Sequence, residues 1–262
     1  MFSSLEDITQ TFGINFKDIN NEYSNEILDI YNGSIDKYKK SENGLILNTI
    51  GTYYKLVKTN YKLMKKYYLM AIKLGNHCAM YNLGNHYRFE EKNYELMKKY
   101  YLMAIELRHD NTMNNLGHYY KNIEKNYELM KKYYLMAIEL GNNRAMNNLG
   151  HYYQYIEKDY ELMKKYYLMA IKLGNINAMI NLGNYYRYIE KNYELMKKYY
   201  IMAIESGYDE NKIKLSDIEK YYYLGIYKNK KDVNIFKNKC NTLSKEQECG
   251  ICDRDELCIP LE

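Results

Sequence analysis

The 262-residue chain carries 38 basic and 33 acidic side chains, and its net charge of +5 is too small to indicate a nucleic-acid partner. A single proline favours helices, and no apolar run is long enough to span a bilayer. The first ten residues, MFSSLEDITQ, lack the basic and then apolar pattern of a secretion signal. We therefore expect a cytoplasmic, non-secreted protein whose cysteines are thiols or metal ligands rather than disulfides.

Residues 1–47 do not match the pattern that fills most of the chain. The segment GLILNTIGTYY, which begins at Gly44, has the composition of a degenerate first helix. The end units of a stacked array have one face without a neighbour, so their sequences diverge from the rest. We expect residues 1–47 to form N-terminal capping helices.

A 33-residue period organises residues 48–207. The block NYELMKKYYLMAIELG, which begins at Asn126, recurs at this period with few changes, and so does a block of the form NLGHYY. A period of this length is typical of stacked helical hairpins. The central methionines of the first block are Met64, Met97, Met130, Met163 and Met196, and the glycines of the second are Gly51, Gly84, Gly117, Gly150 and Gly183.

Two helices are predicted in each repeat, as residues 142–174 illustrate. Four apolar residues lie close to an i, i+3, i+4, i+7 spacing, which puts them on one side of a first helix. The second helix has a wider apolar face, which suits a helix that contacts its own partner and both neighbouring repeats. The residues are Ala145, Met146, Leu149 and Tyr153 in the first helix, and Leu162, Met163, Tyr166, Tyr167, Ala170, Ile171 and Leu173 in the second.

Polar residues and glycines mark the helix ends. An Asn or Asp precedes each second helix, where its side-chain oxygen can cap free backbone N–H groups. Glycine usually follows the second helix, in a position that favours left-handed backbone, and Arg108 in that position predicts a looser turn. The glycine in the middle of each first helix predicts a close approach of two backbones. The caps are Asn60, Asn93, Asn126, Asp159 and Asn192, and the terminal glycines are Gly75, Gly141, Gly174 and Gly207.

The repeat unit resembles the Sel-one-like repeats, a subclass of the tetratricopeptide-like (TPR-like) helical hairpins. In one unit the resemblance is carried by Ala145, Leu149, Gly150, Tyr153, Tyr166, Tyr167, Ala170, Ile171 and Gly174. It implies an all-α fold, a right-handed α-solenoid of 33-residue helix-turn-helix repeats, that scaffolds protein complexes without catalysis of its own. Near-identical arrays rich in Tyr, Asn and Lys also resemble those of giant DNA viruses of the mimivirus type, which would place the protein in the host cytoplasm.

Lysine pairs and tyrosines recur in every second helix. The lysines could follow a phosphate backbone, but glutamates three and four residues earlier favour ion pairs along the helix. The tyrosines could stack on single-stranded nucleic acid, but their spacing favours the core, with hydroxyl groups at its rim. We therefore expect no nucleic-acid partner. The pairs are Lys65-Lys66, Lys98-Lys99, Lys131-Lys132, Lys164-Lys165 and Lys197-Lys198.

Three columns of the first helix change from repeat to repeat against a nearly fixed background. Their spacing of i, i+4 and i+7 places them on one helix face. First helices line the concave surface of tetratricopeptide-like stacks, so the resemblance implies that this face binds a partner protein or peptide. Neutral drift after recent duplication explains the variation equally well. The predicted partner-binding residues are Tyr81, Asn85, Arg88, Asn114, His118, Lys121, Asn147, His151, Gln154, Ile180, Asn184 and Arg187.

The last part of the chain departs from the repeat. Residues 208–239 are predicted to contain a C-terminal capping helix, because Ser216 to Glu219 has the form of a capping box. Residues 240–262 form a cysteine-rich tail.

The cysteines of the tail have the spacing of metal ligands. Cys249 and Cys252 form half of a tetrahedral zinc site, and Cys240 and Cys258 are further candidate ligands. The pattern also resembles the opening of a RING finger, although the later ligand pairs of that family are missing. A truncated RING, a small all-thiolate zinc site and a tail with free thiols all remain open.

The sequence leaves two functions open. The first is a non-catalytic scaffold that binds a protein or peptide ligand on the concave face, with no membrane partner. The second is the substrate-recognition part of a RING-type ubiquitin ligase whose zinc module is partial or lost. No nucleophile, acid pair or phosphate loop supports an enzyme, and zinc is expected only in the tail. His118 and His151 lack recurring metal partners, and Cys78 is expected to be an ordinary thiol.

Overall fold

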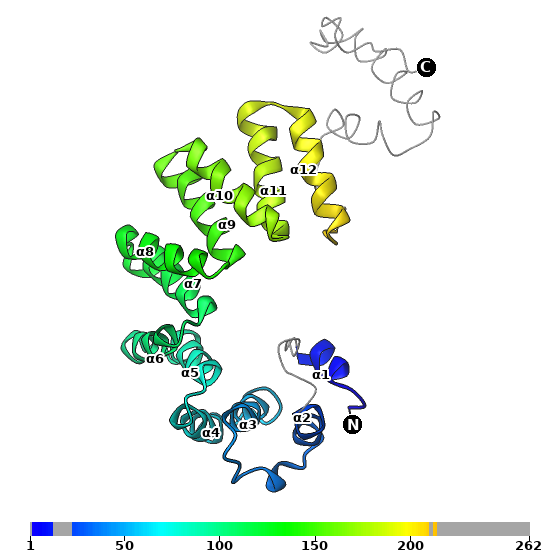
Figure 1. The fold of residues 1–262 in the computed structure, drawn as a ribbon, viewed down its shortest axis with the longest axis vertical. Helices are drawn as coiled ribbons and strands as arrows, with labels where there is room; N and C mark the ends of the chain where they lie inside the picture. The colour runs from blue at the N-terminus through cyan, green and yellow to red at the C-terminus, as the bar shows by residue number, and fades with distance from the viewer. Residues whose placement is uncertain (1, 13–22, 210–211, 214–262) are drawn as a thin grey trace, which may run out of the picture. The chain divides into compact units, whose positions relative to one another are not determined.

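The computed structural model describes residues 2–12, 23–209 and 212–213 (Figure 1). These residues form helices and turns without strands, in the successive helix pairs of an α-solenoid. The chain divides into two compact units, Met1–Asn148 and Leu149–Glu262. The predicted all-α repeat fold is confirmed.

The first unit contains two short helices and then regular helix pairs. First helices lie on one side of this unit and second helices on the other (Figure 1). The short elements are α1 (Leu5–Phe12), α2 (Ser24–Tyr31) and the 3-10 turn η2 (Ile35–Lys37). The pairs are α3 (Gly44–Leu56) with α4 (Tyr61–Lys73), α5 (His77–Phe89) with α6 (Tyr94–Glu106), and α7 (Asp110–Tyr119) with α8 (Tyr127–Glu139), where η3 (Tyr120–Glu124) extends α7.

The second unit continues the same pattern. The unit boundary falls inside α9 (Asn143–Tyr152), which η4 (Tyr153–Glu157) extends and α10 (Tyr160–Lys172) follows. The last pair is α11 (Ile176–Tyr185), extended by η5 (Tyr186–Glu190), and α12 (Tyr193–Glu205).

The predicted caps of the second helices are confirmed. Each Asn or Asp side chain accepts a hydrogen bond from the backbone N–H three residues later, as Asn93 does from Leu96 at 3.0 Å. The terminal glycines have φ values between 73° and 96°. The looser turn predicted at Arg108 is wrong, because Arg108 adopts the same left-handed backbone (φ 59°), and its N–H donates to Ile105 O at 2.8 Å.

The glycine in the middle of each first helix faces a tyrosine ring. A Cβ atom added to Gly84 would lie 2.5 Å from Cδ1 of Tyr101, and the other four repeats repeat this contact at 2.5–2.7 Å. The predicted approach of two backbones is therefore corrected: a tyrosine ring of the second helix fills the space that the missing side chain leaves. The rings are those of Tyr68, Tyr101, Tyr134, Tyr167 and Tyr200, and all are buried.

In each repeat, a further tyrosine at the end of the first helix stacks on a tyrosine of the second helix. Tyr87 of α5 stacks on Tyr100 of α6 with ring centroids 5.6 Å apart, and every other repeat has an equivalent pair at 5.5–5.7 Å. The central methionine and the alanine of each second helix are fully buried beside them. The predicted use of tyrosine and methionine as core residues is confirmed.

The turn between the two helices of a repeat differs between the first two repeats and the last three. In the last three repeats the first helix ends in one turn of π-helix, namely η3, η4 and η5. A lysine with left-handed backbone then follows, with φ of 53–56° at Lys125, Lys158 and Lys191.

Several predictions concern residues that the structure does not describe. The capping box at Ser216 and the cysteines Cys240, Cys249, Cys252 and Cys258 lie outside the described residues. The domain boundaries and the hand of the superhelix stay predictions. Among the described residues, no helix is both long and apolar enough to cross a membrane.

Candidate partner-binding surface

The three predicted columns lie on one face of the first helices, but most of their members are partly covered. On α5 they are Tyr81, Asn85 and Arg88, all half-buried. His118 on α7 is the exposed member. Asn114, Gln154 and Arg187 are buried, with 8–9% of their surface exposed. A buried side chain offers little surface to a partner, so these three are better explained by contacts inside the array.

Some column residues join neighbouring repeats. The asparagine of the NLG block donates toward the preceding repeat in three repeats: Asn115 Nδ2 lies 3.2 Å from Tyr81 Oη and 3.4 Å from Asn85 Oδ1. Asn148 Nδ2 likewise donates to Asn114 Oδ1 at 2.9 Å. Variation in the columns therefore reflects these structural bonds as well as any partner.

Other column residues accept from the buried tyrosine hydroxyls. Tyr101 donates to Asn85, and Tyr200 donates to Asn184 at 2.6 Å. In the repeat where His151 takes the equivalent position, Tyr167 instead donates to Gln154 at 2.8 Å. This bond gives Gln154 a structural role.

Tyr134 breaks this pattern. Its equivalent acceptor would be His118, but its buried hydroxyl has no hydrogen-bond partner among the described residues. The His118 ring instead turns to Arg88 of the preceding repeat, whose Nη2 lies 2.8 Å from His118 Nδ1. Burial and the nearby charges of Arg88 and Lys121 lower the pKa of His118. A neutral His118 is therefore favoured in the folded protein.

Large apolar side chains are exposed at the turns between the helices of a repeat. We call Tyr155, Ile156, Tyr188 and Ile189 the turn edge of the second unit; each has 47–56% of its surface exposed. Phe89 and Ile123 are their counterparts in the first unit, at 61% and 50%. These residues were not predicted to be functional, because the turn was interpreted only as a loop. Their signal was an aromatic and an isoleucine repeating at the 33-residue period.

The turn edge adjoins the predicted columns. The His151 ring centroid lies 4.4 Å from that of Tyr155, and the Arg187 guanidinium lies 4.6 Å from the Tyr188 ring centroid. Arg88 lies over Phe89 in the same way, at 4.8 Å. A partner that touches the turn edge would therefore also reach the neighbouring column residues.

A hydrogen-bonded network holds the turns in place. Tyr119 donates to Glu124 Oε1 at 2.7 Å, and Lys98 Nζ of the preceding second helix lies 3.2 Å from the same oxygen. These two donors lower the pKa of Glu124. Tyr185, Glu190 and Lys164 repeat the arrangement in the second unit. The backbone that presents the exposed residues is thus fixed from two helices.

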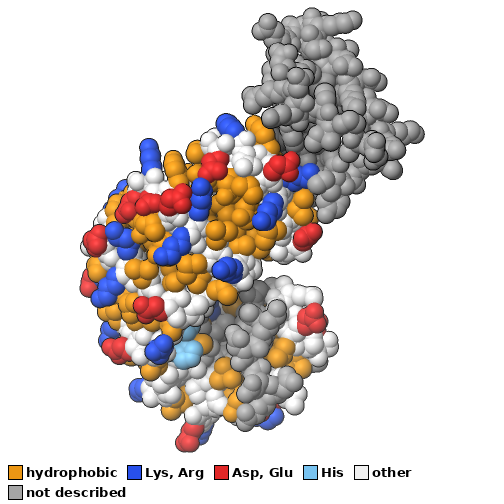
Figure 2. All heavy atoms as spheres, turned by 45° about the horizontal axis from the view of Figure 1, so that its top comes forward, with side chains coloured by type: hydrophobic (Ala, Val, Ile, Leu, Met, Phe, Trp, Pro, Cys, Tyr) orange, Lys and Arg blue, Asp and Glu red, His pale blue; other side chains and the backbone are white. Residues whose placement is uncertain are grey.

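The predicted pairing of lysines with glutamates of the same helix is confirmed for the first lysine in three repeats. The first lysine pairs with the glutamate three residues earlier, as in Lys98 with Glu95 at 3.2 Å and Lys131 with Glu128 at 3.1 Å. The second lysine lies over the adjacent tyrosine ring in all five repeats, at 5.5–5.7 Å. Figure 2 shows basic and acidic side chains interspersed on the visible face, without a basic band.

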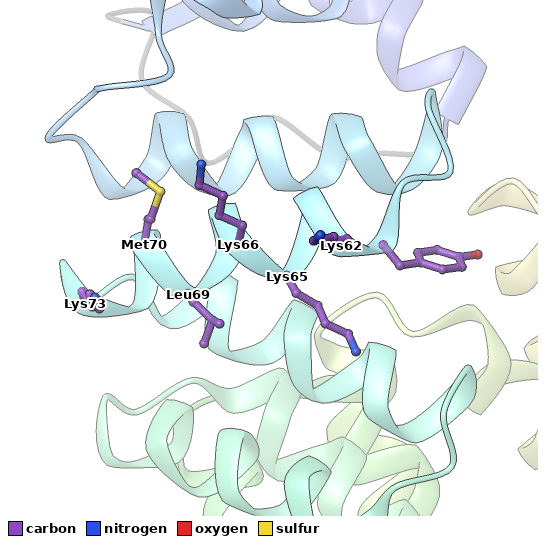
Figure 3. A pocket seen from close by; sticks show the side chains of 7 residues that line it. Lys62, Lys65, Lys66, Leu69, Met70 and Lys73 are labelled. Carbon is purple, nitrogen blue, oxygen red and sulfur yellow. The ribbon is translucent and has the colours of Figure 1, made fainter.

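A shallow depression lies along α4 (Figure 3). Its lining includes Lys62, Lys65, Lys66 and Lys73, and every lining residue belongs to that one helix. Lys65 already pairs with Glu91 of the next repeat. Since one helix face does not enclose a ligand, the depression is not a small-molecule site.

Solved structures share this fold. A Sel1 repeat protein from Oxalobacter formigenes has 21% sequence identity and a TM-score of 0.62, over 84% of this chain and 99% of that one. A protective antigen of uropathogenic Escherichia coli with an SLR fold has 22% identity and a TM-score of 0.59, over 78% of this chain and 46% of that one. An immunity protein from Pseudomonas aeruginosa has 18% identity and a TM-score of 0.50, over 71% and 76%.

These similarities show a shared fold of Sel1-like helical repeats. No protein-family model matches the chain, and no curated protein matches it either.

Proposed function

We propose that the chain is a non-catalytic scaffold that binds another protein on the first-helix side of its repeats. The observation that carries this proposal is the turn edge of the second unit. Tyr155, Ile156, Tyr188 and Ile189 keep about half of their surface exposed. The hydrogen bonds of Tyr152 with Glu157 and of Tyr185 with Glu190 hold the backbone of these turns in place. Rigid aromatic and isoleucine side chains flanked by arginine are typical of the energetic centre of a protein interface.

The remaining column residues of the second unit extend this surface. His151, Ile180 and Asn184 lie on the first helices and are half-buried, so each retains some accessible surface. Polar side chains around an apolar centre exclude water and set specificity. The partner is then a folded protein or a peptide with an apolar anchor.

The ubiquitin-ligase alternative depends on the tail alone. Cys240, Cys249, Cys252 and Cys258 lie outside the described residues, and nothing in the repeats favours that function. It stays a prediction.

Quantitative capture of partners from the source cells tests the proposal. We expect a Tyr155→Ser/Tyr188→Ser variant to lose partners that the unchanged protein retains, with affinity at least about tenfold lower. Leu135→Ser/Leu168→Ser is the matched control, because these leucines are 42% and 41% exposed on second helices. Equal loss in both variants, or no loss in the tyrosine variant, would contradict the proposal.

A further inference from the structure

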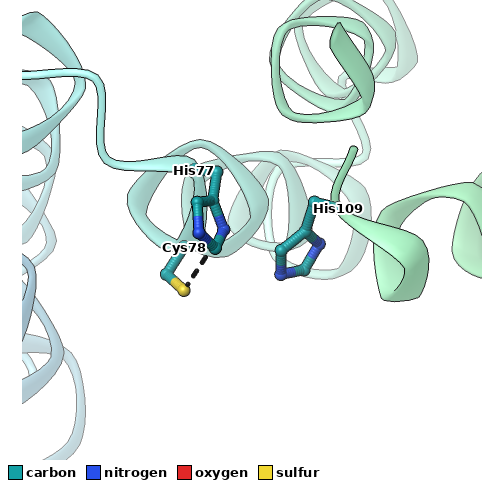
Figure 4. Close-up of side chains that lie close together, drawn as sticks. All are labelled: His77, Cys78 and His109. Carbon is teal, nitrogen blue, oxygen red and sulfur yellow. Dashed lines mark hydrogen bonds between the residues drawn. The ribbon is translucent and has the colours of Figure 1, made fainter. Parts of the chain in front are cut away.

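Three metal-ligating side chains converge where α5 and α7 begin (Figure 4). His77 and Cys78 open α5, and His109 is the residue before α7. One ligand atom from each lies within 4.8 Å of the other two. His77 and His109 are 32 residues apart in the sequence and meet because consecutive repeats stack in register.

The distances approach those of a metal site. His77 Nδ1 and Cys78 Sγ lie 3.6 Å apart, and the His77 and His109 ring centroids lie 5.0 Å apart. Two ligands of one tetrahedral zinc ion are separated by roughly 3.5 Å, so the first pair already fits. His77 is exposed, so its ring can rotate to shorten the remaining separation.

Thr112 fixes the orientation of the His109 ring. The Thr112 backbone N–H donates to His109 Nδ1 at 3.2 Å, and Thr112 Oγ1 lies 2.6 Å from the same nitrogen. To coordinate a metal ion through Nε2, the neutral ring must carry its proton on Nδ1, donate it to the Thr112 hydroxyl and give up the bond from the backbone N–H. Thr112 is fully buried, so this support is rigid.

The repeats provide a comparison for each of these residues. The position of His109 is held by Asn76, Asn142 and Asn175 in other repeats, where the Asn side chain caps the first helix. The position of Thr112 is held by Ala79, Ala145 and Ala178, and that of Cys78 by Asn111, Arg144 and Asn177. His109, Thr112 and Cys78 therefore all differ from the residues at the equivalent positions of the other repeats.

We propose that His77, Cys78 and His109 form a zinc site between two consecutive repeats of the first unit. Imidazole and thiolate ligands select zinc over magnesium or calcium. On binding, the Cys78 thiol releases its proton to solvent, the thiolate and two imidazoles coordinate the ion, and water occupies the fourth position.

The bound ion would connect the loop before α7 to the start of α5. This connection would fix two neighbouring repeats relative to each other, as the hydrogen bond from Asn142 Nδ2 to Asp110 Oδ2 (2.7 Å) does at the equivalent place in the next pair of repeats. The site goes beyond the proposed scaffold function and does not depend on it.

Zinc titration of the full chain tests the site, with Cys240, Cys249, Cys252 and Cys258 changed to serine so that the tail cannot bind. Calorimetry should give one zinc per chain, and cobalt should give a thiolate-to-metal absorption band. His109→Asn and Cys78→Asn each place a residue that other repeats already carry, so the fold should be retained. Both should weaken zinc binding by more than about tenfold.

Two further variants separate a metal site from a structural cluster. Thr112→Ala leaves all three ligands in place and should weaken zinc binding by about tenfold, because His109 loses its orienting partner. His118→Asn, a histidine change on the same helix, should leave zinc binding unchanged. Absence of zinc binding by the folded serine-tail protein would overturn the proposal, and so would unchanged binding after His109→Asn or Cys78→Asn.

Discussion

The Tyr101 ring packs directly against the backbone of Gly84. A methyl group on that glycine would lie 2.5 Å from the ring, closer than non-bonded carbon atoms approach. We expect Gly84→Ala to lower the free energy of unfolding by about 1–3 kcal/mol, as overpacking does in other cores. Chemical denaturation of the variant measures this change. Alanine in a helix is otherwise about 1 kcal/mol more favourable than glycine, so an increase in stability would refute the packing assignment.

The hydroxyl of Tyr134 has no hydrogen-bond partner among the described residues, whereas that of the equivalent Tyr101 has one. Changing each tyrosine to phenylalanine should therefore change the free energy of unfolding in opposite directions. Tyr134→Phe removes a buried donor that has no partner and should raise the free energy of unfolding by about 1 kcal/mol. Tyr101→Phe removes a satisfied donor and leaves Asn85 Oδ1 with only the long bond from Asn115, so it should lower stability by about 1 kcal/mol. Equal effects of the two substitutions in thermal denaturation would contradict this difference.

His118 should make stability depend on pH. Its pKa is lower in the folded protein than its ordinary value of 6.5, because of burial and the charges of Arg88 and Lys121. The unfolded chain therefore binds more protons just below pH 6.5, so stability falls as the pH drops through that range. The melting temperature of His118→Asn, measured with a chelator from pH 8 to pH 5, should fall less than that of the unchanged protein. An identical slope in the two proteins would argue against a His118 that is neutral in the folded protein.

Arg108 occupies a backbone position that four other repeats give to glycine. Its φ of 59° lies in the left-handed region, which costs a residue with a Cβ atom roughly 1 kcal/mol. Arg108→Gly should therefore raise the free energy of unfolding by up to about 1 kcal/mol. Lys99→Gly, at an exposed position in the interior of α6, is the control and should lower it by about the same amount. A loss of stability in Arg108→Gly would show that its side chain makes a larger contribution than the backbone strain.

The sequence predicted the repeat fold well because periodicity and capping are local signals. The spacing of the methionines, the caps such as Asn93 and the terminal glycines such as Gly141 each follow from a few consecutive residues. The contact of Gly84 with Tyr101 was anticipated only as a close approach, because nothing local identifies the group that fills the space. The sequence showed that Gly84 was unusual but not why.

The candidate sites were harder to predict because they depend on how one repeat meets the next. Variation at Gln154 suggested a partner, whereas the structure shows a bond to a buried tyrosine. Cys78 was treated as an isolated thiol, since His109 lies far from it in the sequence. The exposed turn residues, such as Tyr155, were overlooked because apolar residues in short loops carry no periodic helix signal. Contacts across repeats become visible only when the stacking register is known.

Side-chain footprinting of the protein bound to its captured partner is the most direct test of the proposed interface. Hydroxyl-radical oxidation reports how accessible each tyrosine, leucine and isoleucine is in the free and bound states. We predict that the partner protects Tyr155, Tyr188 and Ile189 while Leu168 on α10 keeps its reactivity. Protection of Leu168 and the other exposed leucines of the second helices, with the turn residues unchanged, would contradict the account.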